Sequence, residues 1–233
     1  MNPLSSKNTQ RGDPHASQPI ASAGPAPQDA AGTLVMIHGR GDSAEGILSL
    51  YDTIGVHDLA ALAPQAFGHT WYPQSFLAPL EANQPYLDSA LRKIESIVAD
   101  LLSQGVASER IALLGFSQGA CLAAEYALRH PGRCGALVMF TGGLIGPPGR
   151  AWRLAPPATT LGGLPVLLTG SDVDEWVPEA RVRETASVLT ALGADVQCRI
   201  YTGRAHIVSD EEIVDARELI TRVQQNTSGH LVI

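Results

Sequence analysis

The chain has 233 residues, of which 45% are hydrophobic and 17% are charged, and this is enough for one domain with a sizeable core. Its formal net charge of −7 provides no basic surface for nucleic acid, and no apolar run approaches the ~20 residues of a membrane span, so we expect neither nucleic-acid binding nor stable membrane insertion. The three cysteines are scattered without disulfide or metal-ligand spacing, which predicts a reducing, cytoplasmic compartment and no metal site.

The first thirty residues differ in composition from the rest of the chain. They are rich in Ala, Pro, Ser and Gln, poor in large hydrophobic residues, and lack the apolar core of a signal peptide. Such a composition is typical of flexible segments. We therefore predict a flexible extension over residues 1–30, a folded domain over 31–226 and a short tail over 227–233.

From residue 32 onward, short aliphatic runs bounded by Gly or Pro alternate with segments of helical periodicity. This alternation predicts an α/β fold, with a mostly parallel sheet of about six or seven strands and helices on both faces. The strands are expected at 32–39, 58–64, 110–115, 135–140, 164–170 and 195–201. The helices are expected at 43–54, 84–104, 118–130, 178–192 and 209–225, with long loops over 65–83 and 141–163.

Residues whose side chains or neighbouring backbone could take part in catalysis follow four of the predicted strands. Ligands of such sheets collect at the carboxyl ends of the strands, so we expect these side chains to meet at one edge. They are His38-Gly39-Arg40, Ser117, the pair Asp172 and Asp174, and His206.

Ser117 stands in the segment G-F-S-Q-G, between a predicted strand and a predicted helix. This is the pattern and the context of a nucleophile elbow, a sharp turn that projects the serine hydroxyl above the sheet. The backbone approaches itself so closely there that residues two before and two after must be small, as Gly115 and Gly119 are. The alternative is an ordinary helix cap, which predicts nothing about the other three groups.

An elbow serine needs a base and an acid that orients the base, and in α/β sheets that carry such an elbow these residues follow in the chain order Ser, acid, His. Of the seven histidines, His206 alone lies between the last predicted strand and the last predicted helix. The acid follows the preceding strand, where Asp172 and Asp174 are two residues apart. Spacing leaves both open.

The segments IHGRGDS, LLGFSQGA, GSDVDEWVP and YTGRAHIVSDEE resemble those of the phospholipase/carboxylesterase family of α/β-hydrolases, in order over roughly residues 32–223. The resemblance implies a single-domain α/β-hydrolase fold. It selects Asp174 as the acid, since the family places it three residues before a Val-Pro pair. It also implies an oxyanion hole formed by the backbone N–H groups of Arg40 and Gln118, with His38 as a brace of that turn.

The resemblance further implies a serine carboxylesterase that needs no cofactor and forms an acyl-serine intermediate. No segment is long enough for a large cap domain, and the aromatic residues of two loops are expected to line a small apolar pocket for a short-to-medium acyl ester. They are Trp71, Tyr72, Phe76 and Trp176.

Three other functions stay open: an acyl-protein thioesterase, a lysophospholipase, and a ligand-binding protein that has kept the fold without turnover. The chain departs from acyl-protein thioesterases at TWYP, at Trp176 and over 141–163, so the resemblance supports the general chemistry more than those substrates. Members of the family often dimerise over the face that carries the site, so the resemblance leaves a homodimer of this kind open for this chain.

Overall fold

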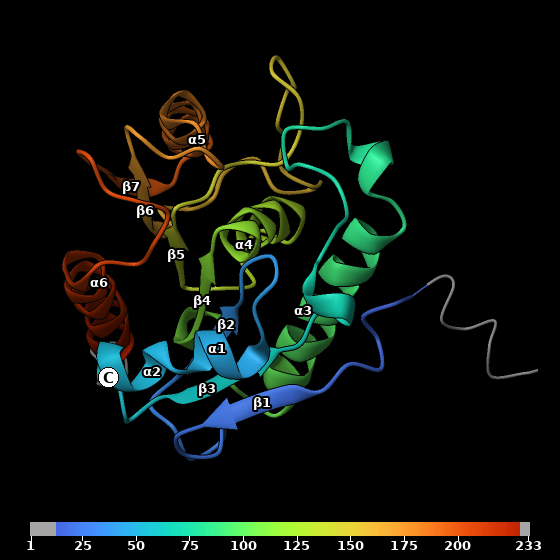
Figure 1. The fold of residues 1–233 in the computed structure, drawn as a ribbon. Helices are drawn as coiled ribbons and strands as arrows, with labels where there is room; N and C mark the ends of the chain where they lie inside the picture. The colour runs from blue at the N-terminus through green and yellow to red at the C-terminus, as the bar shows by residue number, and fades with distance from the viewer. Residues whose placement is uncertain (1–12, 229–233) are drawn as a thin grey trace, which may run out of the picture.

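The computed structural model of the protein describes residues 13–228, with side chains to residue 221, and centres on a seven-stranded sheet (Figure 1). The strands lie in the order β1-β3-β2-β4-β5-β6-β7, and every neighbouring pair is parallel except β1 with β3. Their bounds are β1 Ile20–Ala23, β2 Thr33–Ile37, β3 Ala60–Pro64, β4 Ile111–Phe116, β5 Ala136–Phe140, β6 Pro165–Ser171 and β7 Asp195–Tyr201.

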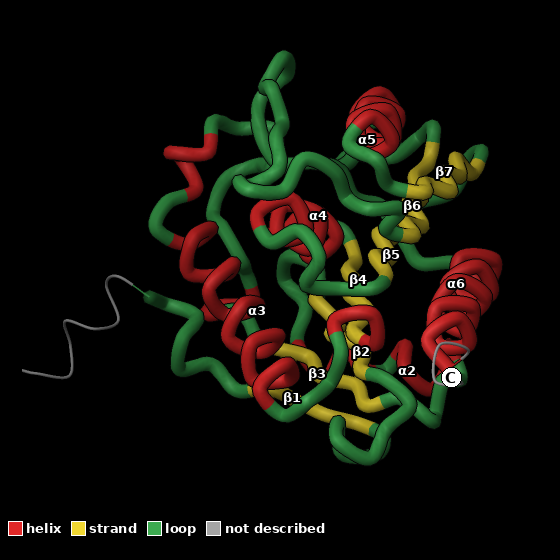
Figure 2. The backbone as a smooth tube through the Cα atoms, turned by 180° about the vertical axis from the view of Figure 1, so that it is seen from behind, coloured by secondary structure: helices red, strands yellow, loops and turns green. Residues whose placement is uncertain are grey.

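Helices cover both faces of this sheet (Figures 1 and 2). The helices α3, α4 and α5 pack on one face and α1, α2 and α6 on the other, each face with its own apolar cluster. The helix bounds are α1 Ala44–Leu48, α2 Leu50–Ile54, α3 Tyr86–Ser103, α4 Gln118–Arg129, α5 Glu179–Ala191 and α6 Asp210–Ser228, with short 3-10 turns at Phe67–His69, Leu80–Asn83 and Ser108–Arg110.

The central strands are buried on both sides because their side chains alternate between these two clusters. In β2, Val35 and Ile37 face the cluster under α3 and α4, while Leu34 and Met36 face the cluster under α1 and α6. This explains why the strands read as continuous aliphatic runs in the sequence. The predicted architecture, a mostly parallel sheet with helices on both faces, is confirmed.

The predicted flexible extension over residues 1–30 is wrong for residues 13–30. Ile20–Ala23 forms the edge strand β1, which pairs antiparallel with β3 in the register Ile20↔Pro64. His15 is fully buried. The sequence gives no hydrophobic pattern here because polar and backbone contacts hold the segment, and residues 1–12 lie outside the described part.

Two predicted boundaries also move. The helix predicted over 43–54 is divided at Ser49 into α1 and α2. At the other end α6 continues to Ser228, two residues beyond the predicted domain end, and the rest of the predicted tail lies outside the described residues.

Candidate active site

Ser117 occupies the turn between β4 and α4 in a backbone conformation that side chains rarely adopt, with φ 53° and ψ −116°. Its N–H donates to the carbonyl of Phe140 at 2.9 Å, which fixes the turn to the neighbouring strand. Its hydroxyl makes no capping bond to α4. The helix-cap interpretation is therefore wrong, and a strained residue at the carboxyl edge of the sheet indicates a functional role.

Two glycines allow this turn. A Cβ built on Gly115 would lie 2.4 Å from the carbonyl carbon of Gly119, and a Cβ on Gly119 would lie 2.0 Å from the carbonyl oxygen of Ile37. Both contacts are to backbone that cannot move aside cheaply. The glycine spacing around Ser117 thus follows from the close packing of α4 against β2 and β4.

His206 and Asp174 form a continuous hydrogen-bonded line with Ser117. His206 Nε2 lies 2.9 Å from Ser117 Oγ, and His206 Nδ1 lies 2.6 Å from Asp174 Oδ2. The carboxylate is fully buried, while a fifth of the imidazole is exposed. A carboxylate on Nδ1 favours the tautomer with the proton on Nδ1, which leaves the Nε2 lone pair facing the hydroxyl.

The loop after β6 also holds the second oxygen of Asp174. Oδ1 accepts hydrogen bonds from the N–H groups of Trp176 at 2.8 Å and Val177 at 2.9 Å. Burial by itself would raise the pKa of Asp174, but the hydrogen bonds from His206 and from these two N–H groups outweigh it and hold the pKa below its ordinary value. Asp174 is consequently ionised at neutral pH.

Asp172, the other candidate acid, has a different partner. Its Oδ1 accepts a hydrogen bond from the N–H of Gly203 at 2.7 Å. It thus joins the loop after β6 to the loop that carries His206. The structure brings Asp174 to the imidazole and assigns Asp172 to this loop contact.

A buried network behind His206 supports its loop, and sequence reasoning missed it. The hydroxyl of Ser171 donates to the carbonyl of Arg204 at 2.6 Å, and Arg204 Nη2 donates to Thr141 Oγ1 at 2.7 Å. Arg204 also pairs with Glu212 of α6, whose side chain is fully buried. The signal that could have found this network is a pair of opposite charges flanking the predicted base.

The two predicted oxyanion-hole residues lie beside the nucleophile. Gln118 is the first residue of α4, and Arg40 follows β2, the strand paired with β4. A Cβ built on Gly39 would lie 3.5 Å from Ser117 Cβ, so the turn before Arg40 touches the serine. The N-terminus of a helix offers free N–H groups and the positive end of its dipole, which favours an anion at this point.

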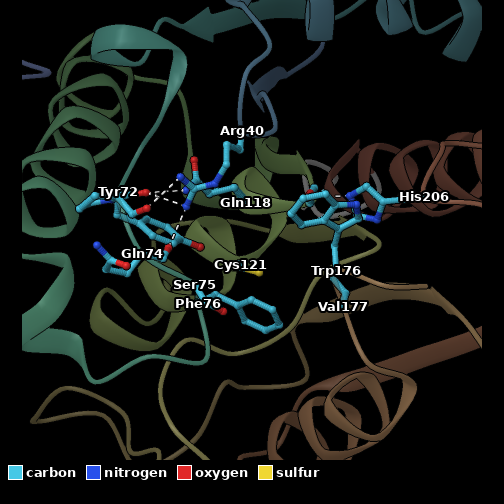
Figure 3. Close-up of a pocket in the computed structure, with 12 residues that line it drawn as sticks. Arg40, Tyr72, Gln74, Ser75, Phe76, Gln118, Cys121, Trp176, Val177 and His206 are labelled. Atoms are coloured by element: carbon cyan, nitrogen blue, oxygen red, sulfur yellow. Dashed lines mark hydrogen bonds between the residues drawn. The ribbon is translucent and has the colours of Figure 1, made fainter. Parts of the chain in front are cut away.

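The side chains of these same two residues clamp the loop over 65–83 (Figure 3). Gln118 Oε1 accepts from the N–H of Trp71 at 2.8 Å, and Gln118 Nε2 donates to the carbonyl of Tyr72 at 2.9 Å. The Arg40 guanidinium donates to the carbonyls of Tyr72 at 2.9 Å, Pro73 at 3.0 Å and Gln74 at 2.8 Å. The Arg40 side chain is thus committed to this loop.

His38 braces the same turn, as predicted. Its Nδ1 donates to the carbonyl of Gly39 at 2.7 Å, and its Nε2 accepts from the N–H of Ala66 at 3.1 Å. Burial lowers the pKa of His38 below its ordinary value. A neutral imidazole with both ring nitrogens engaged in hydrogen bonds is suited to hold the turn in place and not to transfer protons.

A cavity of about 590 Å³ opens beside Ser117 and His206. Tyr72, Phe76 and Trp176 line it, as predicted, and Trp176 stands at its edge with 68% of its surface exposed. Trp71 does not line it. This indole is fully buried behind the wall, and its Nε1 donates to the carbonyl of His38 at 2.8 Å.

The sequence did not identify Cys121 and Val177 as parts of the cavity wall. Burial raises the pKa of the Cys121 thiol to about 11, so it is protonated and unreactive at neutral pH. Within residues 13–228, no group of three or more His, Cys, Asp and Glu side chains is placed to hold a metal ion. In the same part of the chain, no helix combines the length and apolarity required to cross a bilayer.

Comparisons with family models, curated proteins and solved structures all find esterases or thioesterases. The sequence model of a family described as Phospholipase/Carboxylesterase matches residues 20–224. The structure of a phospholipase/carboxylesterase from Dyadobacter fermentans superposes with a TM-score of 0.82 at 38% identity, covering 88% of this chain and 97% of the other. Esterase PE8 superposes with a TM-score of 0.70 at 25% identity, covering 89% and 98%. Acyl-protein thioesterase 1 of Eremothecium gossypii is 26% identical over 228 residues, covering 88% and 93%.

Proposed function

The chain belongs to the phospholipase/carboxylesterase family of α/β-hydrolases and is a carboxylic ester hydrolase, and we propose that it cleaves short-to-medium acyl esters with the triad Ser117, His206 and Asp174. The observation that carries this proposal is the unbroken line of hydrogen bonds from Asp174 Oδ2 through the imidazole to Ser117 Oγ, at 2.6 and 2.9 Å. A serine on a strained turn with an oriented imidazole is an activated nucleophile.

In the proposed reaction, Ser117 Oγ attacks the ester carbonyl while His206 Nε2 takes the hydroxyl proton. The imidazolium then gives this proton to the leaving alcohol, and an acyl-serine remains. Water, deprotonated by His206, releases the acid and restores the serine. Asp174 holds the imidazole in the required tautomer and stabilises its positive charge through the 2.6 Å hydrogen bond.

The negative oxygen of each tetrahedral intermediate is assigned to the N–H groups of Arg40 and Gln118. Donors fixed in advance stabilise such an oxyanion strongly, and the loss of one costs about 10²–10³ in rate. Support comes from the rigidity of both residues, since their side chains are committed to the carbonyls of the 72–74 segment. Neither peptide group has to reorganise during the reaction.

The substrate class is proposed from the cavity. Its walls are mainly apolar at Phe76, Val177 and Trp176, and it is open at the Trp176 edge, so a small acyl group is enclosed while the alcohol side stays accessible. Acyl-protein thioesterase is the second candidate, because a curated relative of that name aligns over 88% of this chain. A thioester carbonyl needs the same nucleophile and oxyanion donors.

The proposal is tested with p-nitrophenyl esters from acetyl to dodecanoyl, comparing the wild type with Ser117→Ala. We expect the highest kcat/KM at short-to-medium chains and no turnover in the variant. An ester and a thioester of the same acyl group then separate the two candidates by their kcat/KM ratio. A folded wild type that turns over none of these compounds would refute the proposed hydrolase activity.

A further inference from the structure

Residues 13–18, here called the strap, precede β1 and lie outside the region matched by the family, which begins at residue 20. In Figure 1 the strap is the blue segment that runs past α3 toward β1. It reaches the loop that Arg40 and Gln118 clamp, and the proposed reaction gives it no role. Its contacts fall into two groups.

The first group ties the strap to α3. Asp13 accepts hydrogen bonds from Ser89 Oγ at 2.5 Å and from Arg92 Nε at 3.0 Å. Lys93 Nζ donates to the carbonyls of Ala16 at 3.3 Å and Gln18 at 2.6 Å. These bonds anchor the strap on the helix without touching the loop.

The second group comes from a single side chain, His15, which is fully buried. Its Nε2 donates to the carbonyl of Trp71 at 3.0 Å, and its Nδ1 accepts from the N–H of Phe67 at 3.0 Å. Two partners of opposite polarity require the neutral ring with the proton on Nε2. His15 therefore holds the loop at two points, four residues apart.

The peptide groups of Trp71 connect His15 to the site. His15 holds the carbonyl of Trp71 from one side, and Gln118 Oε1 holds its N–H at 2.8 Å from the other. The indole Nε1 donates to the carbonyl of His38, two residues before Arg40. A displacement of Trp71 would be transmitted to both residues assigned to the oxyanion hole.

We propose that His15 is a positioning residue for the oxyanion hole: by holding Phe67 and Trp71 it keeps the loop in register with Gln118 and His38. This inference rests on the proposed function. It assigns the strap a part in transition-state stabilisation, in addition to its part in stability. Since the oxyanion forms only after attack, the effect falls on kcat and leaves KM nearly unchanged.

The electrostatic surroundings agree with this neutral ring. Burial, with smaller contributions from His38 and Lys93, lowers the pKa of His15 to about 4, against opposing contributions from the carbonyl of Trp71 and from Asp13. The ring is neutral at neutral pH, where both hydrogen bonds to the loop persist.

The test compares His15→Ala and His15→Gln with Lys93→Met as the matched control. Lys93→Met removes strap bonds to α3 but none to the loop. We expect His15→Ala to lower kcat on a p-nitrophenyl ester about tenfold with KM within about twofold, a fraction of the about 10²–10³ lost with a whole oxyanion donor. His15→Gln, whose amide can donate to Trp71, should recover part of kcat, and Lys93→Met should lower the melting temperature with kcat unchanged.

Equal kcat in folded His15→Ala and Lys93→Met would overturn the inference and leave the proposed function standing. Absence of Ser117-dependent turnover in the wild type would instead overturn the proposed function. In that case amide hydrogen exchange over residues 66–74 still decides on the loop: faster exchange in His15→Ala than in Lys93→Met supports the loop-holding role, and equal exchange refutes it.

Discussion

Replacing Asp174 with Asn tests the orientation of the imidazole with almost no change in shape. Asp174 Oδ1 accepts two backbone N–H groups, from Trp176 and Val177. Only the carbonyl oxygen of an asparagine can accept both, so its NH₂ group must face His206 Nδ1, where Oδ2 now lies at 2.6 Å. The amide then donates to Nδ1.

An imidazole that accepts at Nδ1 carries its proton on Nε2. Nε2 would then point an N–H at Ser117 Oγ across the 2.9 Å contact and could not take the hydroxyl proton. The wrong tautomer in a triad costs about 10⁴ in kcat. This equals about 5.5 kcal/mol of transition-state stabilisation. Since the backbone bonds to the loop persist, the thermal stability should change little.

The assay is hydrolysis of a p-nitrophenyl ester at neutral pH, with melting temperatures measured for each protein. Asp172→Asn is the matched control, because the asparagine oxygen can still accept from Gly203 and no triad bond is altered. We expect Asp172→Asn to retain most of the wild-type kcat. An active Asp174→Asn, or an Asp172→Asn that loses activity instead, would refute the role of Asp174 as the acid that orients His206.

Three further predictions concern stability. Gly119→Ala places a Cβ 2.0 Å from the carbonyl oxygen of Ile37 and should lower the unfolding free energy by about 3 kcal/mol, so a melting temperature equal to the wild type would contradict the elbow packing. Glu212→Gln leaves Arg204 without its buried carboxylate and should lower the free energy of unfolding, measured in urea, by about 3–5 kcal/mol. An unchanged free energy of unfolding would mean that the pair does not hold the loop. An unfolded histidine binds its proton below a pKa of 6.5 but folded His15 only near 4, so the unfolded state gains protons first as the pH falls. The wild type should thus lose about 2 kcal/mol more stability than His15→Gln between neutral pH and about pH 5, and parallel pH profiles would refute the buried neutral ring.

The parts of the fold that were predictable are those with a repeating hydrophobic signal. The buried strands from β2 to β6 read as aliphatic runs because both their faces are covered, and α3 shows an apolar face at helical spacing. By contrast, β1 has the sequence IASA, whose residues alternate between exposed and partly buried, and this pattern is too short and too weak to predict a strand. Backbone pairing with β3 holds it, and that pairing leaves no trace in side-chain composition.

The site divides in the same way. The candidate catalytic residues follow strands in a fixed order, so Ser117 and His206 could be predicted from the sequence. Their supports were not, since they depend on which backbone carbonyl a side chain reaches after folding: Arg40 on the 72–74 carbonyls and His15 on Trp71. Trp71 was misassigned to the pocket because an aromatic residue in a loop carries no signal of which side of the wall it occupies.

The most direct test of the proposed mechanism is to trap the covalent intermediate. Rapid mixing of the protein with excess p-nitrophenyl ester, acid quench and mass spectrometry would determine whether an acyl group is attached and to which residue. Because an activated aryl ester acylates a serine faster than water releases the acyl group, the proposed mechanism predicts a burst of p-nitrophenol of at most one equivalent of protein, with a single acyl group on Ser117. Turnover with no acylated Ser117, or with the acyl group on another residue, would contradict it.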